Sequence, residues 1–442
     1  MPLETIPPIP PELQDLAAWL MDAGQIEAPV EEIVQGCCRR LVAAGIPVCR
    51  INIGGLLLHP VHIVRTVIWD GDTGEVRSEA LPREVLLAAD AMESPFNWLE
   101  SKAIPFLRCR LDVEDGGPSF PIFDRFRSQG MTDYFAFFRS NGRPRRLAWS
   151  DLPPGTDGIV GAWTTRQAGG FTDAQIAGLK AISRPLALTI KAVSADDLTA
   201  TLLDTYLGRY TGQHVLQGRI GRGDGELVEA ALWYSDLRDS TRLADTLPLR
   251  DYLNRLNAYF ECSAGAVIEQ GGEVLKFIGD AVLAIFPVRP DHGGRAAACT
   301  AALDAARDAL RRIRQHNDGR ASEADGSALQ AGISLHVGEV MYGNVGTERR
   351  LDFTATGPAV NELVRLESLC KVLGRPVAVS AAFRAAIAAQ LVDLGTHPIA
   401  GKPEGLRVFT LPDPEQADRG QETTGPVPGK APPPAGSGRS AD

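Results

Sequence analysis

The chain has 442 residues, of which 44% are hydrophobic and 23% are charged. This is the composition of a globular protein, and the length exceeds what one ordinary core requires, so two domains with linkers are expected. The formal net charge of -10 argues against a general nucleic-acid binder, which presents a basic face. No apolar run approaches the roughly 20 residues that span a membrane. The N-terminus also lacks a secretory signal pattern, so we expect a soluble, cytoplasmic protein.

Seven cysteines are scattered along the chain, with no CxxC pair and no Cys/His spacing typical of metal ligands. Their odd number and irregular spacing are typical of reduced thiols, with core packing as the simplest role. A zinc site is therefore not expected.

The first half of the chain is predicted to be a mixed α+β domain. Residues 1–30 form a proline-rich lead-in with a short helix at 12–22, and a domain follows at 31–193. Its exit helix begins at Thr172 or Asp173 and is expected to be bent or interrupted near Pro185. The linker at 194–225 carries a separate helical segment at 196–207. The other elements expected in this half are a helix at 31–40 and strands at 48–58, 62–70, 133–138 and 158–165.

The second half, at 226–412, alternates strands and helices in the order βαββαβ, with extra elements afterwards. This order predicts a ferredoxin-like α+β domain with helices packed on an antiparallel sheet. Residues 413–442 contain no core formers, and we expect them to be disordered. The expected strands are 227–235, 274–278, 281–286, 329–337, 351–355, 376–379 and 406–411, and the expected helices are 247–269, 293–315, 359–372 and 381–389.

Two aspartates of this second half are candidate metal ligands. Asp236 ends a hydrophobic strand, and Asp280 lies in a Gly-Asp turn between two strands of strong β-formers. Carboxylates on adjacent strand ends suit a pair of Mg²⁺ or Mn²⁺ ions bound with a triphosphate. The simpler alternatives are that Asp239 and Ser240 only cap the next helix, and that Gly-Asp is only a turn.

Three further side chains suggest binding of a nucleotide. Lys276 interrupts an apolar strand and therefore needs an anionic or carbonyl partner. Asn361 and Arg365 are four residues apart and share one helical face, where they can hold a ribose and stabilise phosphoryl charge. The alternative is that Arg365 pairs with a neighbouring acid, Glu362 or Glu367, on a solvated face.

Taken together, residues 227–411 resemble the class III adenylate/guanylate cyclase family. The resemblance is carried by several motifs in the family's order, at 231–241, 270–286, 331–340, 343–346 and 350–367. It implies the following roles: Asp236 and Asp280 bind two metal ions, Lys276 and Thr354 recognise adenine, Asn361 orients the ribose, Arg365 stabilises the transition state, and Lys402 binds phosphate.

The resemblance also implies the reaction and the assembly. ATP would be converted to 3′,5′-cyclic AMP and pyrophosphate in sites shared between two chains, so a symmetric homodimer is expected. Lys276 with Thr354 favours ATP over GTP. The sequence departs from the family at Asp239, where Gly is usual, and at Pro358, where Asp is common. Neither position is catalytic, so these departures concern only local loop shape.

Residues 31–193 resemble a GAF-type sensory domain, although PAS and other α+β sensors show similar patterns. The resemblance rests on the strand–hairpin–strand at 48–77, the strand at 131–137 and the start of the exit helix at 171–174. It implies that an unknown small molecule or other signal regulates the cyclase. The leucines of segment 196–207 would pair in a dimer and transmit that signal.

Two other functions are open on the sequence. One is a non-enzymatic nucleotide-binding module that signals by dimerising. The other is a diguanylate cyclase of the GGDEF type, which shares the βαββαβ topology. That type places its acidic residues within the Gly-Gly turn, whereas here Gly271-Gly272 precede a lysine-bearing strand.

Overall fold

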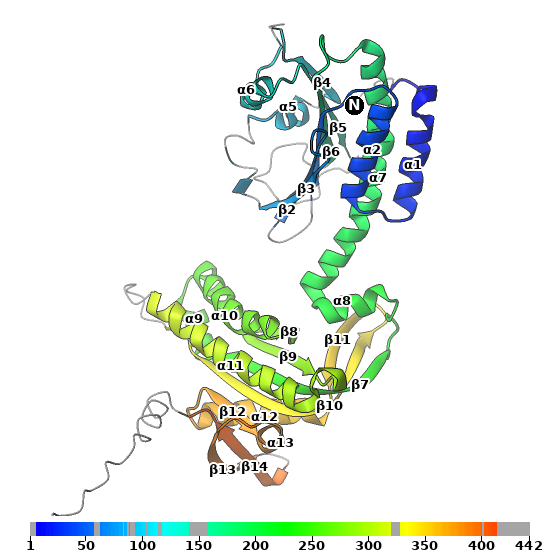
Figure 1. The fold of residues 1–442 in the computed structure, drawn as a ribbon. Helices are drawn as coiled ribbons and strands as arrows, with labels where there is room; N and C mark the ends of the chain where they lie inside the picture. Colours follow the sequence, from blue (N-terminus) through cyan, green and yellow to red (C-terminus); the bar gives the residue numbers. More distant parts are fainter. Residues whose placement is uncertain are drawn as a thin grey trace, which may run out of the picture. The chain divides into compact units, whose positions relative to one another are not determined.

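The computed structural model describes residues 6–56, 62–82, 84–85, 88, 93–102, 104–113, 117–140, 158–319, 328–399 and 402–412. Its internal contacts divide the chain into two compact units, Met1–Tyr206 and Leu207–Asp442, which are both drawn in Figure 1. The residues of the expected tail, 413–442, lie outside the described part. No helix in the described part is long and apolar enough to cross a membrane. All seven cysteines are free thiols.

The N-terminal unit is built on one six-stranded antiparallel sheet with the strand order β3-β2-β1-β6-β5-β4. Its strands are β1 (Arg50–Leu56), β2 (His62–Asp70), β3 (Val76–Pro82), β4 (Phe106–Arg110), β5 (Asp133–Ser140) and β6 (Gly158–Thr165). Its helices are the 3-10 turn η1 (Pro11–Leu13), α1 (Gln14–Gln25), α2 (Val30–Ala43), α5 (Pro95–Lys102), α6 (Pro121–Ser128) and α7 (Asp173–Leu207).

The two faces of this sheet are covered by different helices. Helices α1, α2 and α7 lie on one face, and α5 and α6 lie on the other (Figure 1). Ile51 and Ile53 of β1 are buried in the core that α1, α2 and α7 share. Because side chains alternate along a strand, Arg50 and Asn52 of β1 point to the face that α5 and α6 cover. The second core, on that face, is rich in aromatic residues such as Phe123 and Tyr134.

Helix α7 starts as predicted but does not break. The Thr172 hydroxyl accepts a hydrogen bond from the Gln175 amide at 3.2 Å, and the Gln175 side chain accepts one from the Thr172 amide at 2.9 Å. This reciprocal pair is a capping box. The predicted interruption near Pro185 is wrong, because the helix runs unbroken for 35 residues. A proline inside a helix removes one backbone hydrogen bond, and the fully buried neighbours Ile182 and Leu186 stabilise the helix across that point.

Two further features of this unit add to what was predicted from the sequence. The segment between 83 and 130, which showed no periodic pattern, contains α5, β4 and α6. These elements are only five to eight residues long, so packing of their aromatic side chains determines them more than local propensity does. The helix expected in the lead-in is α1, and it packs into the main core through Leu16 and Leu20.

The C-terminal unit contains an eight-stranded sheet with the order β13-β14-β12-β10-β7-β9-β8, and β11 pairs with β10 off this path. Its strands are β7 (Gly225–Leu237), β8 (Glu273–Ile278), β9 (Ala281–Pro287), β10 (Ala331–Thr347), β11 (Arg350–Thr356), β12 (Val377–Ser380), β13 (Val392–Ile399) and β14 (Lys402–Thr410). Its helices are α8 (Arg209–Leu216), α9 (Ser240–Thr246), α10 (Leu249–Glu269), the 3-10 turn η2 (Pro290–His292), α11 (Gly294–Gly319), α12 (Pro358–Val372) and α13 (Ala381–Ala385).

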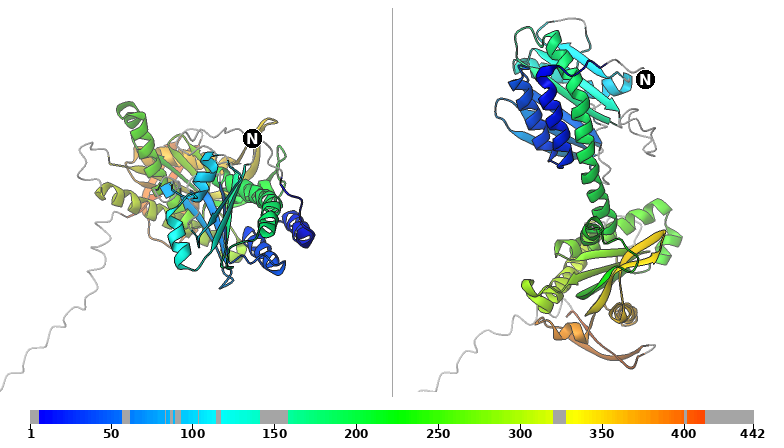
Figure 2. Two further views of the ribbon diagram at one scale, coloured as in Figure 1. Left: turned by 90° about the horizontal axis from the view of Figure 1, so that it is seen from above. Right: turned by 90° about the vertical axis from the view of Figure 1, so that its right-hand side faces the viewer.

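The predicted α+β class with antiparallel sheets is confirmed in this unit. The elements β7-α10-β8-β9-α11-β10 give the βαββαβ order, and the strands β10-β7-β9-β8 pair antiparallel throughout. One face of the sheet packs on α10 and α11, and Trp233 and Phe286 of the sheet are buried in the core that lies between them. The other face contributes Leu232 and Ile285 to a second core with α12. Figure 2 shows this sheet from two further sides.

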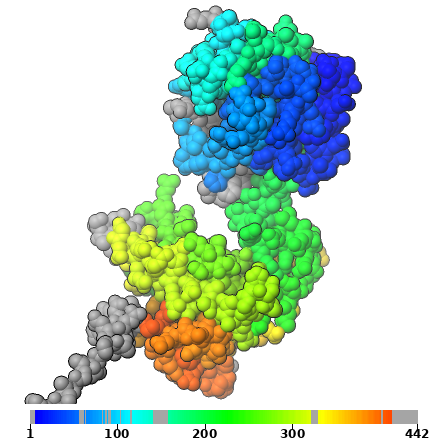
Figure 3. All heavy atoms as spheres, in the orientation of Figure 1, coloured from blue at the N-terminus to red at the C-terminus, as the bar shows by residue number. Residues whose placement is uncertain are grey.

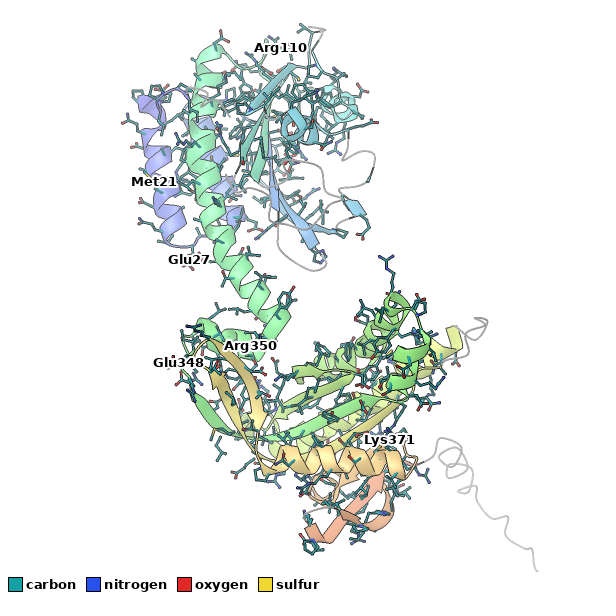
Figure 4. All side chains as sticks on the ribbon, turned by 180° about the vertical axis from the view of Figure 1, so that it is seen from behind. Met21, Glu27, Arg110, Glu348, Arg350 and Lys371 are labelled. Atoms are coloured by element: carbon teal, nitrogen blue, oxygen red, sulfur yellow. The ribbon has the colours of Figure 1, made fainter. Side chains whose placement is uncertain are left out.

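Three elements differ from the sequence prediction in this unit. The helix expected at 247–269 is α10, which begins after the Pro248 cap, and it is preceded by a separate short helix, α9, that was not predicted. Strand β10 is 17 residues long and continues into a hairpin with β11, whose turn carries Glu348 and is followed by Arg350, the first residue of β11 (Figure 4). Strand β13 was not predicted. It pairs with β14 through two bulges, and these strands lie in the orange lobe of Figure 3.

Candidate active site

The two candidate metal ligands lie together at the ends of neighbouring strands. Asp236 is the penultimate residue of β7, where it is paired with Ala281 of β9. Asp280 lies in the turn between β8 and β9, which Gly279 makes possible with a backbone φ of 64°. The Leu237 amide donates to the Asp280 carbonyl at 3.4 Å. Strand pairing therefore brings the two carboxyl groups close enough for Asp280 to raise the pKa of Asp236.

The surroundings of Asp236 change the protonation of its carboxyl group. Burial, the neighbouring Asp280 and the charge of Glu367 together raise the pKa of Asp236 to about 7. Arg238 opposes this effect, but its guanidinium also pairs with the buried Glu367 at 3.0 Å. Two oxygen donors with so little compensating positive charge are a suitable donor set for divalent cations. The residues present therefore fit the metal ions that the sequence pattern predicts.

The loop after Asp236 explains one departure from the cyclase pattern. Asp239 has a φ of 57° and a ψ of 22°, in the left-handed region that glycine adopts most readily. It occupies the cap position of α9, yet its carboxylate makes no capping hydrogen bond. The alternative in which Asp239 caps this helix is therefore wrong. The backbone retains the glycine-like conformation although the residue is an aspartate.

Lys276 has a partner that the sequence analysis did not identify. Its ammonium group forms an ion pair with the carboxylate of Asp352, which lies on β11. Thr354 lies two residues further along the same strand and so projects from the same face as Asp352. The lysine is therefore held on the side of β11 that also carries Thr354. In the sequence, the two-residue spacing of Asp352 and Thr354 on a predicted strand was the signal that both side chains share one face.

Asn361 and Arg365 lie on the exposed face of α12, one turn apart. The alternative in which Arg365 pairs with a neighbouring acid is wrong, because Glu362 is bound to Lys402 and Glu367 to Arg238. Within the described part of the chain, neither Asn361 nor Arg365 has a hydrogen-bonding side-chain partner. Both are thus available to a ligand.

Lys402 is placed beside α12, at the start of β14. Its ammonium group donates to Glu362 at 2.7 Å. The other carboxylate oxygen of Glu362 lies 3.8 Å from Nδ1 of the buried His336, which also bonds the Ser380 hydroxyl at 2.9 Å. Burial lowers the pKa of His336. A phosphate-binding role for Lys402 requires that it leave Glu362.

Exposed apolar side chains surround these polar residues. Phe277 and Ile278, next to Lys276, are 52% and 47% exposed, and Val364, next to Arg365, is 42% exposed. Large exposed hydrophobic residues that flank a site are typical of a surface that another protein covers.

No family model matches the chain. Among curated proteins, it is 30% identical over 204 residues to the terminal-differentiation-specific adenylate cyclase of Dictyostelium discoideum, which covers 45% of the chain and 9% of that protein. It is 32% identical over 141 residues to the adenylate cyclase of Anabaena cylindrica, covering 32% of the chain and 27% of the relative. It is 30% identical over 212 residues to adenylate cyclase 2 of Rhizobium meliloti, covering 46% and 55%.

Solved structures similar to the chain are also cyclases. The adenylyl cyclase CyaB from P. aeruginosa has a TM-score of 0.40 at 22% identity, covering 43% of the chain and 96% of that structure. A bacterial light-regulated adenylyl cyclase has a TM-score of 0.42 at 24% identity, covering 61% and 72%. The chain spans between about a tenth and just over half of the length of the curated relatives named above. Their names support a class III adenylate/guanylate cyclase catalytic domain in this chain.

Proposed function

We propose that the chain is an adenylate cyclase that converts ATP to 3′,5′-cyclic AMP and pyrophosphate with two divalent metal ions, Mg²⁺ or Mn²⁺. The observation that carries this proposal is the pairing of Asp236 and Asp280 at adjacent strand ends, where burial and mutual repulsion favour a bound cation. Divalent ions held there lower the pKa of the ribose 3′-hydroxyl and neutralise the triphosphate.

The residues of the chain supply positioning and charge. In the reaction a bond forms between the ribose 3′-oxygen and the α-phosphorus, the bond to the β-phosphate oxygen breaks, and pyrophosphate leaves. The hydroxyl proton passes to solvent. Asn361 orients the ribose, and the guanidinium of Arg365 stabilises the charge that develops on the phosphoryl oxygens. Their exposure without other partners supports these roles, and Lys402 contacts phosphate when it is released from Glu362.

Selection of the base rests on Lys276 and Thr354. The lysine donates to a ring nitrogen of adenine, and the threonine hydroxyl accepts from the N6 amine, a pattern that guanine does not match. The ion pair between Lys276 and Asp352 supports this role, because it restricts the lysine to the side of the strand that carries Thr354.

Two chains form the active sites in this proposal. Asp236 and Asp280 of one chain meet Lys276, Thr354, Asn361 and Arg365 of the other, and the symmetric homodimer holds two equivalent sites. The exposed apolar residues Phe277, Ile278 and Val364 support an interface at this position.

The N-terminal unit acts as a GAF-like sensory domain in this proposal. The domain at 31–193 receives an unknown small molecule or other signal, and the segment 194–225 passes it to the catalytic domain at 226–412. The continuity of α7 through residue 207 supports a mechanical connection. The exposure of Tyr206, 77%, supports pairing of this helix with a second copy.

The experiment that tests the proposed activity is an assay of the purified chain with Mn²⁺ and either ATP or GTP, with products identified by mass spectrometry. We expect 3′,5′-cyclic AMP from ATP and far less cyclic product from GTP. The Asp236→Ala variant should lose turnover while remaining folded, and Asp245→Ala, an exposed aspartate of α9, should retain it. Binding of ATP without any product would support the non-enzymatic module, and a cyclic dinucleotide would support the diguanylate cyclase.

A further inference from the structure

The N-terminal unit contains a cavity that the cyclase reaction does not use. It has a volume of about 380 Å³ and lies between the sheet and helices α5 and α6. This volume falls within the range of roughly 300–1,000 Å³ that is typical of small-molecule pockets. The sheet contributes Arg50, Asn52, Tyr134 and Thr164, and the helices contribute apolar side chains such as Phe96 and Phe126.

Strand register places the polar residues on the cavity side. Arg50 of β1 is paired with Thr164 of β6, which is paired with Tyr134 of β5, so these three form one row across the sheet. Asn52 lies two residues after Arg50 and therefore projects from the same face. The sheet thus presents a guanidinium and an amide to the cavity, beside the aromatic side chains of α6.

Two buried polar atoms of these residues lack partners. Nε of Arg50 and Oδ1 of Asn52 each expose less than 1 Å² and form no hydrogen bond within the described part of the chain. The adjacent Thr164 hydroxyl is already engaged with the Cys49 thiol at 3.4 Å. Buried polar groups are rarely left unpaired in folded proteins. One unmet donor and one unmet acceptor on two residues that line the cavity point to a ligand that supplies both counterparts.

The charge of the cavity defines the ligand further. Both Arg50 and Arg125 line it, whereas Glu93 is the one lining carboxylate within the described residues and is exposed. Burial is the main cause that lowers the pKa of Arg50, and the nearby charge of Arg125 adds to it. Asp70 of β2 and Arg77 of β3 also act on Arg50, with opposite signs. Oδ1 of Asp70 is occupied by the amides of its own turn, at 3.0 and 3.3 Å.

We propose that this cavity binds a small organic anion, either a carboxylic acid or a phosphate monoester with an aromatic or aliphatic part. Its oxyanion is held by Arg50 and Arg125, because guanidinium groups bind such oxygens with charge-assisted hydrogen bonds. A donor group of the ligand bonds the Asn52 carbonyl, and the apolar part packs on Phe96 and Phe126. This binding site does not depend on the catalytic activity, since it is assayed by binding alone.

The test is titration calorimetry of the full chain with four probes: benzoate, phenyl phosphate, inorganic phosphate and phenol. We expect saturable binding of at least one of the two organic anions at one site per chain, and weaker binding of both phenol and inorganic phosphate. Whichever organic anion binds more tightly identifies the oxyanion. Arg50→Gln should weaken that binding by about tenfold or more, as expected for loss of a charge-assisted hydrogen bond. The matched control is Arg39→Gln, an exposed arginine of α2, on the other side of the sheet.

Several results would overturn the proposal. They are an absence of saturable binding of both organic anions, equal affinity for phenol, equal affinity for inorganic phosphate, or unchanged affinity in both Arg50→Gln and Arg125→Gln. If Arg50→Gln does not fold, Arg125→Gln decides, because this exposed residue of α6 has little role in packing. A loss of affinity in Arg125→Gln with no loss in Arg39→Gln would support the proposal.

Discussion

Replacement of Asp236 by asparagine should stabilise the metal-free protein at high pH. Because the folded-state pKa of about 7 exceeds the ordinary value of 3.8, the folded chain holds this proton more tightly than the unfolded chain does. Stability is therefore lost as the pH rises from about 4 to 7. The full shift corresponds to at most about 4 kcal/mol. Solvent screening of this partly exposed carboxylate reduces the value to about 1–2 kcal/mol, and Asp236→Asn should recover that amount at pH 8.

The assay is thermal unfolding of wild type and Asp236→Asn at pH 4 and pH 8, in chelator and in Mn²⁺. In chelator at pH 8, the variant should melt roughly 2–8 °C higher in its C-terminal unit, and the difference should vanish at pH 4. Mn²⁺ should stabilise wild type much more than the variant. Asp245→Asn, an exposed aspartate of α9, is the matched control. A variant that is less stable than wild type at pH 8, or equal stabilisation of both by Mn²⁺, would refute the reasoning.

Three further substitutions test individual contacts. Asp352→Asn releases Lys276 from its ion pair. We therefore expect the KM for ATP to rise by about tenfold and the preference for ATP over GTP to fall in steady-state kinetics. An unchanged preference would argue against a role of Asp352 in positioning Lys276. Asp133→Ala removes the buried partner of Arg108 and of the Phe171 amide, at 2.9 and 3.0 Å. It should lower the free energy of unfolding by about 3 kcal/mol in urea titrations, and a change below 1 kcal/mol would contradict this. Asp239→Gly relieves a left-handed backbone and should raise stability by up to about 1 kcal/mol, whereas a clear loss in the same titration would show that the aspartate side chain contributes.

The sequence was most informative where local chemistry determines the structure. The start of α7 at Thr172 was predicted, and it is stabilised by a capping box between residues three apart, Thr172 and Gln175. The strong β-formers around Gly279-Asp280 were likewise sufficient to predict two strands and a tight turn. Both features depend on a few neighbouring residues, so a single sequence contains the required information.

Features that depend on distant residues were missed or misjudged. The pairing of Lys276 with Asp352 joins residues 76 apart in the chain, and only the packing of β8 near β11 brings them together. The continuity of α7 through Pro185 depends on burial against α1, α2 and the sheet. Helices α5 and α6 are short and gain their stability from aromatic contacts such as Phe126 with Tyr134. Tertiary packing overrides local propensity in each case.

The most direct test of a shared two-metal cyclase site is complementation between two inactive variants. Asp236→Ala lacks a metal ligand and Arg365→Ala lacks the transition-state arginine, so each alone should produce no cyclic AMP. After mixing and subunit exchange, half of the dimers contain both chains, and each of these has one intact site, so about one quarter of wild-type activity should return. A mixture no more active than its components, beside an active wild type with exchanging subunits, would contradict the account.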